Sequence, residues 1–147
     1  MAITTAMCNS FKQELLKGEH DLDNHTLKIA LIKASPSGTY GAATTNYSDV
    51  TGNSDEATGA QYDAGGQNLD SPTVTLSGST AFVDFADEIF SGVTVSADGA
   101  IIYNTSTTPA NKAIAVFDFG STVTSTNGNF TIVFPDNTSS TAVIRIT

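Results

Sequence analysis

The sequence has no tryptophan, a single cysteine and only six lysine and arginine residues. Because one cysteine cannot form an internal disulfide, we expect the fold to be held together by its hydrophobic core. A chain of 147 residues is long enough for this, since such a chain buries roughly 68–70% of its unfolded surface. The lone thiol, Cys8, lies in an apolar stretch near Phe11, which predicts a small core residue rather than a nucleophile.

Positive charge is scarce and lies mainly near the start of the chain. Four lysines and four acidic residues precede Ala34, whereas only Lys112 and Arg145 accompany the eleven acidic residues from Ala34 onward, giving a net charge of −9. Nucleic acids and anionic membranes are bound by basic surfaces, so we expect neither as a partner. The acidic excess predicts solubility or, as a more specific hypothesis, an acidic patch for a basic partner or a cation.

Long hydrophobic segments are also missing. No apolar run approaches the roughly 20 residues that span a bilayer. The opening MAITTAMCNSFKQELLKG lacks a basic start followed by an apolar stretch, so we expect no secretory signal. These features predict a soluble protein that is made in a cytoplasm.

Catalytic motifs are not found. There is no Gly-x-Ser-x-Gly elbow, phosphate loop or dinucleotide fingerprint. The acidic pairs at 55–56 and 87–88 are sequence neighbours, and in an extended chain neighbouring side chains point to opposite faces. The segment HDLDNH at 20–25 contains potential metal ligands, but nothing makes them converge, so we expect a solvated turn. We predict no catalytic residues, no cofactor and no metal, and therefore no enzyme.

The composition that remains favours strands and turns. Threonine suits strands, and asparagine, glycine and serine suit turns. We predict one mainly β domain over residues 1–147, an antiparallel sandwich or partly open barrel, with one short N-terminal helix. Met7, Phe11 and Leu15 recur at helical spacing and predict that helix over 6–17. Thr4 or Thr5, or Ser10 with Gln13, are its candidate caps, and Gly18 is its candidate stop.

Alternating apolar residues predict strands at 27–33 and repeatedly over 72–147. The pair Asn127-Gly128 predicts a tight hairpin between STVTST and NFTIVF. Short connections leave no room for crossover helices, so neighbouring strands should be antiparallel. The predicted core consists of Leu27, Ile29, Leu31, Val83, Phe85, Ile102, Val116, Phe130, Ile132, Phe134 and Ile144.

Two segments do not fit this regular body. Residues 1–18 form an arm followed by the helix, and residues 35–70 form a long polar loop region, which we expect to be functional or partly ordered. Both segments are candidates for contacts with partners. The predicted interface residues are Ala2, Ile3, Thr4, Thr5, Tyr40, Tyr47 and Tyr62.

Aromatic residues raise a second kind of surface. Phe82, Phe90 and Tyr103 are candidates for a carbohydrate groove or a subunit interface. With eight phenylalanines and no tryptophan, most of these rings are expected in the core, and a lectin role is disfavoured without being excluded.

Several stretches along nearly the whole chain are distinctive: ITTAMCNSFKQELLKGEH, LKIALIK, YDAGGQNL, GAIIYN, NKAIAVFDFG, FTIVFP and AVIRI. Together they resemble small virion structural proteins of tailed bacteriophages, especially phages of cyanobacteria and marine bacteria. They are structural landmarks rather than catalytic signatures, so the resemblance carries over no residue roles.

The resemblance implies a virion component assembled in the bacterial host cytoplasm, where a lack of disulfides fits the reducing environment. The first expectation is a capsid decoration (cement) protein, a homotrimer that binds the major capsid protein or other virion proteins and stabilises the head. A receptor- or glycan-binding module of a head fibre or tail is the second expectation, and a tail or neck assembly protein is the third.

Overall fold

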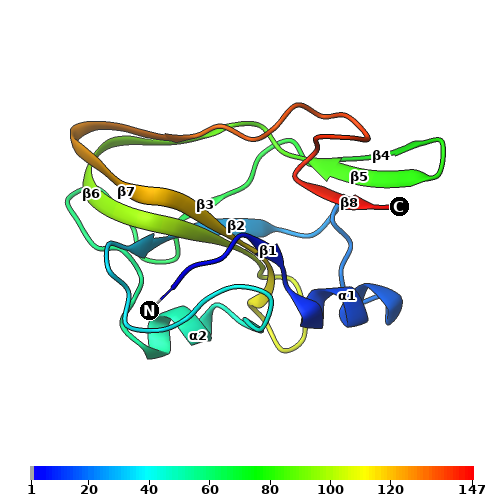
Figure 1. Cartoon of the computed structure of the whole chain (residues 1–147), viewed down its shortest axis with the longest axis horizontal. Coiled ribbons are helices and arrows are strands. Elements are labelled where there is room, and N and C mark those ends of the chain that lie inside the picture. Colours follow the sequence, from blue (N-terminus) through cyan, green and yellow to red (C-terminus); the bar gives the residue numbers. More distant parts are fainter. Residues whose placement is uncertain (1) are drawn as a thin grey trace.

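The computed structural model describes residues 2–147 as two antiparallel sheets and two short helices (Figure 1). The elements in chain order are β1 (Ala6–Met7), α1 (Asn9–Leu16), β2 (Leu27–Lys33), α2 (Ser48–Gly52), β3 (Gln67–Asn68), β4 (Thr73–Ser77), β5 (Thr80–Asp84), β6 (Glu88–Asn104), β7 (Lys112–Ile132) and β8 (Ile144–Ile146).

One sheet has five strands in the order β1-β7-β6-β2-β3, and the other has three in the order β4-β5-β8. The three-stranded sheet lies at one end of the larger sheet, above α1 in Figure 1. Neither sheet closes into a barrel, so the predicted class, a mainly antiparallel β fold with a short N-terminal helix, is confirmed.

The long hairpin of β6 and β7 forms the centre of the larger sheet. Near its loop, residues 99–104 of β6 are all buried, and so are residues 113–116 of β7. These are the continuous apolar runs of the sequence, which fit strands covered on both faces. Farther from the loop, buried Phe90, Val93 and Val95 alternate with exposed residues, because there only one face of the ribbon is covered.

The predicted hairpin at Asn127-Gly128 is wrong. β7 runs through this pair without turning back, and Gly128 lies opposite Val93 of β6. Asn127 does adopt a positive φ of 48°, but at a point where the pairing between β6 and β7 shifts, as in a bulge. β6 pairs with the residues of β7 on both sides of Asn127-Gly128, so this pair forms a local irregularity in the strand instead of a turn. The actual hairpin loop is 105–111.

The N-terminal helix is shorter than predicted. Ala6 and Met7 pair with Val116 and Ala115 as the edge strand β1, so the helix begins at Asn9. Cys8 occupies the N-cap position with no side-chain capping hydrogen bond, and the candidate caps among the threonines and Ser10 are not used. The predicted stop is confirmed, since Gly18 follows the helix with a φ of +72°.

The segment 35–70 is partly ordered, as expected for a loop of that length. It contains α2 and β3, and Tyr40, Val50 and Tyr62 are buried within it. The predicted core is confirmed with one qualification, which is that Ile132 is only half-buried. Phe82, Phe90 and Tyr103 are also buried, as expected for most of the aromatic residues.

The two sheets are joined by aromatic packing. The rings of Phe85, just after β5, and Phe134, just after β7, lie with centroids 5.8 Å apart. The backbone amide of Phe134 donates to Asp87 Oδ1 at 2.9 Å, which fixes the chain as it leaves the larger sheet. The small sheet is therefore anchored at its root, and its β4–β5 hairpin extends away from the body (Figure 1).

Candidate docking surface

Two of the predicted interface tyrosines are internal to the fold. Tyr40 is 2% exposed and Tyr62 is 8% exposed. The hydroxyl of Tyr40 donates to Asp55 Oδ2 at 2.6 Å, and that of Tyr62 donates to Glu56 Oε1 at 3.1 Å. The interface prediction is wrong for both, because the polar segment 35–70 has few aliphatic side chains and packs with its tyrosines instead.

Tyr47 belongs to the same framework. Its ring stacks on Tyr103 with centroids 4.4 Å apart, and its hydroxyl donates to Glu56. Glu56 also accepts from the backbone amide of Gly65, so one carboxylate joins three parts of the loop. The ring of Tyr47 is half-buried and makes these contacts within the chain, so its role at an interface stays a prediction.

Asp55 is the second anchor of this segment, and its side chain is fully buried. Burial alone would raise the pKa of the carboxyl group. Hydrogen bonds from the Ser37 amide, the Tyr40 hydroxyl and the Gly38 amide, together with Lys33 at 2.9 Å, outweigh burial and hold the pKa of Asp55 well below its usual range. The carboxylate therefore stays ionised and fixes the turn at 37–40.

The N-terminal residues are also held by the chain itself. The Thr4 amide donates to the Tyr40 carbonyl, and the Tyr40 amide donates to the Ala2 carbonyl, each at 2.9 Å. Thr5 accepts a hydrogen bond from the Asp118 amide through its hydroxyl oxygen. The sequence analysis set the N-terminal arm apart from the regular body, whereas these hydrogen bonds hold residues 2–5 alongside Tyr40 and β7. The side chains of Ala2, Thr4 and Thr5 remain exposed, so their role at an interface stays a prediction.

The histidine-containing turn is only partly solvated. His20 is buried, with Nε2 2.7 Å from Glu14 Oε2 and Nδ1 3.0 Å from the Asn104 amide nitrogen. The same amide nitrogen lies 2.9 Å from His25 Nδ1. The solvated-turn prediction is wrong for His20, which joins α1 to the end of β6. In residues 2–147 no group of three or more His, Cys, Asp or Glu side chains is placed to hold a metal ion.

Cys8 is a core residue, as predicted. It is fully buried, and burial, together with the nearby Glu14 carboxylate, raises the pKa of its thiol to about 12. A thiol in this state is protonated at neutral pH and does not act as a nucleophile.

The feature that stands apart is the apolar face of the small sheet. Directly opposed residues of antiparallel strands share a face, so the register of the three strands forms two apolar rows. One row is Val74, Val83 and Ile144; the other is Leu76, Ala81 and Ile146. We call these six residues the small-sheet face. All six are apolar, as expected for one side of a sheet that packs on a core.

Only part of the small-sheet face is covered. Val83 and Ile144 are buried, whereas Val74 is 50% exposed, Leu76 is 71% exposed and Ile146 is 51% exposed. A groove of about 570 Å³ separates this face from α1 and the turn that follows it. Its other wall contains Leu15, Leu22, His20, Asp21 and Asp23. The result is an open apolar cleft with an acidic rim.

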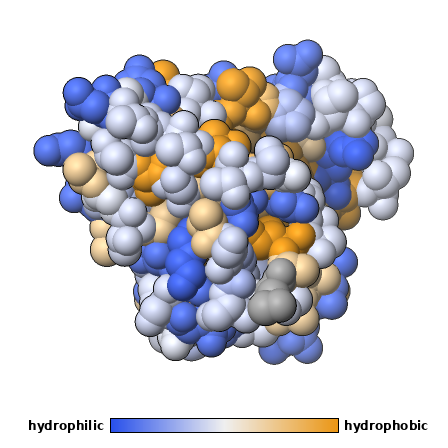
Figure 2. Space-filling view, turned by 60° about the vertical axis from the view of Figure 1, so that its left-hand side comes forward, coloured by the Kyte–Doolittle hydropathy of each residue, from blue (hydrophilic) through white to orange (hydrophobic). Residues whose placement is uncertain are grey.

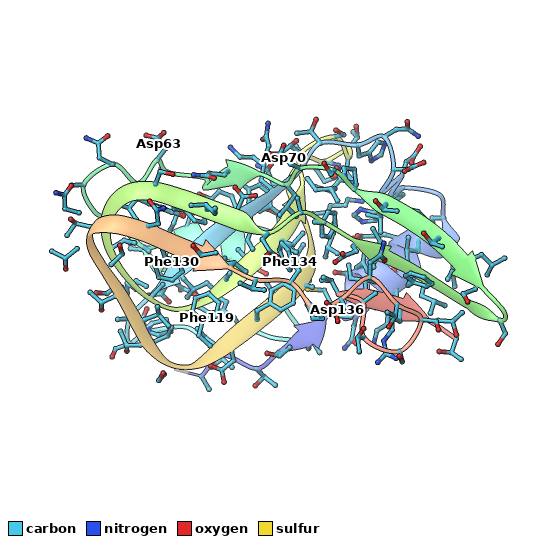
Figure 3. The ribbon with its side chains drawn as sticks, turned by 90° about the horizontal axis from the view of Figure 1, so that it is seen from above. Asp63, Asp70, Phe119, Phe130, Phe134 and Asp136 are labelled. Atoms are coloured by element: carbon cyan, nitrogen blue, oxygen red, sulfur yellow. The ribbon has the colours of Figure 1, made fainter. Side chains whose placement is uncertain are left out.

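A second apolar hollow lies inside the bend of β7. Phe119 and Phe130 come from the two ends of the bend, yet their ring centroids are 5.9 Å apart. Figure 3 shows both rings and Phe134 within this curve. The hollow has a volume of about 610 Å³, and the chain segment from Val133 to Val143 forms part of its wall. Phe130 and Phe134 are buried and Phe119 is half-buried, so of these three rings only that of Phe119 is partly open to the hollow.

Elsewhere the visible surface is more evenly polar. The face in Figure 2, which brings the left side of Figure 1 forward, has separate small apolar patches among polar residues. No helix within residues 2–147 combines the length and apolar character needed to cross a membrane.

The sequence indicates which residues of β4 share the small-sheet face, but not that they are exposed. The alternation in Thr73–Ser77 correctly indicated that Val74 and Leu76 share a side of a strand. The exposure of Val74 and Leu76 depends on which part of the fold packs against them, and the local sequence does not show this. The one local feature that sets this strand apart is its complete lack of charged residues.

Comparison of the chain with protein-family models, curated proteins and solved structures finds no match.

Proposed function

We propose that this chain is a non-enzymatic structural protein of a phage particle, a capsid decoration protein that binds the assembled head as a homotrimer. The observation that carries the proposal is the half-covered small-sheet face on a projecting hairpin. A contiguous exposed apolar surface of this kind is typical of a protein–protein contact. The resemblance of the sequence to small phage virion proteins supplies the proposed setting.

The rest of the fold suits such a role. Residues 2–5 and the tyrosines of 35–70 are fixed by internal hydrogen bonds, so the body is a rigid support for the hairpin. A protein that binds the assembled shell and not the dissociated subunits stabilises the shell by mass action, by about 2.7 kcal/mol per site at 100 times Kd. Stabilisation of this kind requires a docking surface and no catalytic group.

The test is to add the purified chain to heads that lack it and to image the particles. We expect binding at regular positions on the head surface, with a copy number of three per site, and a raised temperature of head disruption. Binding to the neck or tail alone would transfer the proposal to the third expectation, an assembly protein. No binding to any part of the particle would contradict the proposal.

A receptor- or glycan-binding module is the second candidate, and the phenylalanine-lined hollow in the bend of β7 favours it. Aromatic rings offer apolar faces on which sugar rings can stack, and a cavity of this size lies within the range of ligand sites. Binding to host polysaccharide or to host cells, weakened by Phe119→Ala, would support this candidate. Binding to heads in the absence of host binding supports the first.

A further inference from the structure

Within residues 2–147, the outermost strands of the two sheets are β1, β3, β4 and β8. These strands differ in how they are protected against pairing with other chains. β1 and β3 have two residues each, and β8 has three residues and includes Arg145. Very short strands and charged side chains are the usual protection against pairing with other chains. β4 has five residues, all uncharged, with no proline and no shift in its pairing with β5. It is therefore the one long, regular and unprotected edge among them.

The free edge of β4 borders the uncovered part of the small-sheet face. Val74 and Leu76 point to the same face of the sheet as the covered Val83 and Ile144. A further strand paired with β4 would place every second side chain beside Val74 and Leu76. Backbone hydrogen bonds and burial of these two side chains would then act together, which is how extended segments bind to sheet edges.

The charges around the groove indicate the chemistry of that strand. Asp21 and Asp23 stand on the wall opposite the small-sheet face, and no lysine or arginine lines this groove in the described part of the chain. The Asn24 amide side chain donates to Asp21 at 2.9 Å, and this hydrogen bond helps to keep the pKa of Asp21 below its usual value. The rim is therefore negative at neutral pH.

We propose that β4 binds an extended segment of another virion protein in which apolar residues alternate and lysine or arginine residues reach Asp21 and Asp23. The apolar residues extend the small-sheet face, and the basic residues complement the acidic rim. A second copy of this chain fits this groove less well, because it would bring its own acidic rim to Asp21 and Asp23. The inference deepens the proposed function and rests on it.

The test uses a photo-reactive label on β4 in assembled particles. Ser77 is exposed, lies at the end of β4 and accepts Ser77→Cys without disturbing the core. The fully buried Cys8 leaves the new cysteine as the reactive thiol. Ser121→Cys is the matched control, since Ser121 is also an exposed serine in a strand but lies in the bend of β7.

Each labelled protein is added to heads, irradiated and digested, and the attached peptide is sequenced by mass spectrometry. The expected product from position 77 is one segment of another virion protein with alternating apolar residues and at least one lysine or arginine. The label at position 121 should give at least tenfold less of that product. A product joining two copies of this chain, or a partner segment without basic residues, would overturn the inference.

A charge reversal gives an independent readout. Asp23→Lys should weaken binding to heads at least tenfold at low salt, whereas Asp136→Lys, at an exposed position near the end of β7, should change it less than twofold. Equal effects of the two reversals would overturn the acidic-rim part of the inference.

If the unmodified chain does not bind particles at all, the proposed function fails and the inference fails with it. If the chain binds but position 77 gives no cross-link, the inference alone fails.

Discussion

Val74 and Ile144 lie on either side of Val83 in one row of the small sheet, yet Ile144 is 4% exposed and Val74 is 50% exposed. Two apolar residues in equivalent positions on one face are therefore covered very differently. Both residues line the groove between this face and the turn after α1, so the apolar surface of the groove runs from the buried Ile144 to the half-exposed Val74 on the edge strand β4. A surface that continues the core's apolar face but remains open is what a docking site requires.

The phenylalanine packing around the end of β7 should be sensitive to loss of aromatic volume. Phe130 and Phe134 are buried, and each packs against another phenylalanine ring. Phe130→Ala and Phe134→Ala should each lower the free energy of unfolding by about 3–5 kcal/mol, the usual loss for a buried phenylalanine. Val133→Ala is the control, because Val133 is exposed between them and should change stability by less than about 0.5 kcal/mol. Denaturant unfolding measures the stability of all three variants. Equal losses for the three would contradict the burial of Phe130 and Phe134 and the exposure of Val133.

Asp55 should contribute to stability through its charge. Asp55→Asn keeps the shape but removes one acceptor oxygen and the ion pair with Lys33. We expect a loss of at least about 2 kcal/mol, since hydrogen bonds to charged groups contribute about 1.5–3 kcal/mol each. Asp63→Asn, at an exposed position in the same loop region, should be neutral. A thermal melt of the two variants decides the matter, and matching melting temperatures would remove Asp55 from the framework.

Alkaline pH should unfold the protein through its buried tyrosines. Burial, with a further contribution from Asp55, raises the pKa of Tyr40 to about 12, and burial likewise raises that of Tyr103 to about 12. In the unfolded chain tyrosine titrates near pH 10. Between about pH 10 and pH 12 the unfolded state loses protons that the folded state keeps, so stability falls as pH rises. Spectroscopic titration should show phenolate appearing together with unfolding. Full ionisation near pH 10 in the folded protein would contradict the burial of these hydroxyls.

Gly99 should not tolerate a side chain. A Cβ atom at this position would lie 2.3 Å from the Phe117 carbonyl oxygen and 2.9 Å from the Ile3 side chain. Gly99→Ala should therefore lower stability by about 1–3 kcal/mol, as overpacking usually does. Gly52→Ala is the control, because Gly52 ends α2 with open space around it, and alanine there should be neutral or stabilising by up to about 1 kcal/mol. Equal stability of the two variants would contradict the close packing of Gly99 against the Phe117 carbonyl and the Ile3 side chain.

Regular local patterns made much of the fold predictable. The alternation in Leu27–Lys33 gave a strand with the same bounds, and Gly18 marked the end of the helix. Errors arose where a distant partner decided the outcome. Ala6 and Met7 suit a helix but pair with β7, and Asn127-Gly128 suits a turn but lies along β6. Nothing in the local sequence reports these partners.

The candidate site was less predictable for a related reason. Tyrosines in a polar loop suggested an interface, but Asp55 and Glu56 were available to accept their hydroxyl hydrogen bonds. Val74 and Leu76 lie in the region 72–147 where alternating apolar residues predicted strands, but only the folded structure shows that these two side chains are open to solvent. Exposure is a property of the assembled fold, so sequence spacing alone does not determine it.

We propose that the small-sheet face attaches this chain to a phage head. Leu76 and Val133 offer a matched comparison, because each is 71% exposed but only Leu76 lies on β4. The decisive measurement is the number of copies bound per head, titrated for the parent chain, Leu76→Lys and Val133→Lys, with folding of each checked by thermal melting. We predict that Leu76→Lys needs at least tenfold more protein to reach half occupancy, while Val133→Lys matches the parent. Equal occupancy for all three chains would contradict attachment through the small-sheet face.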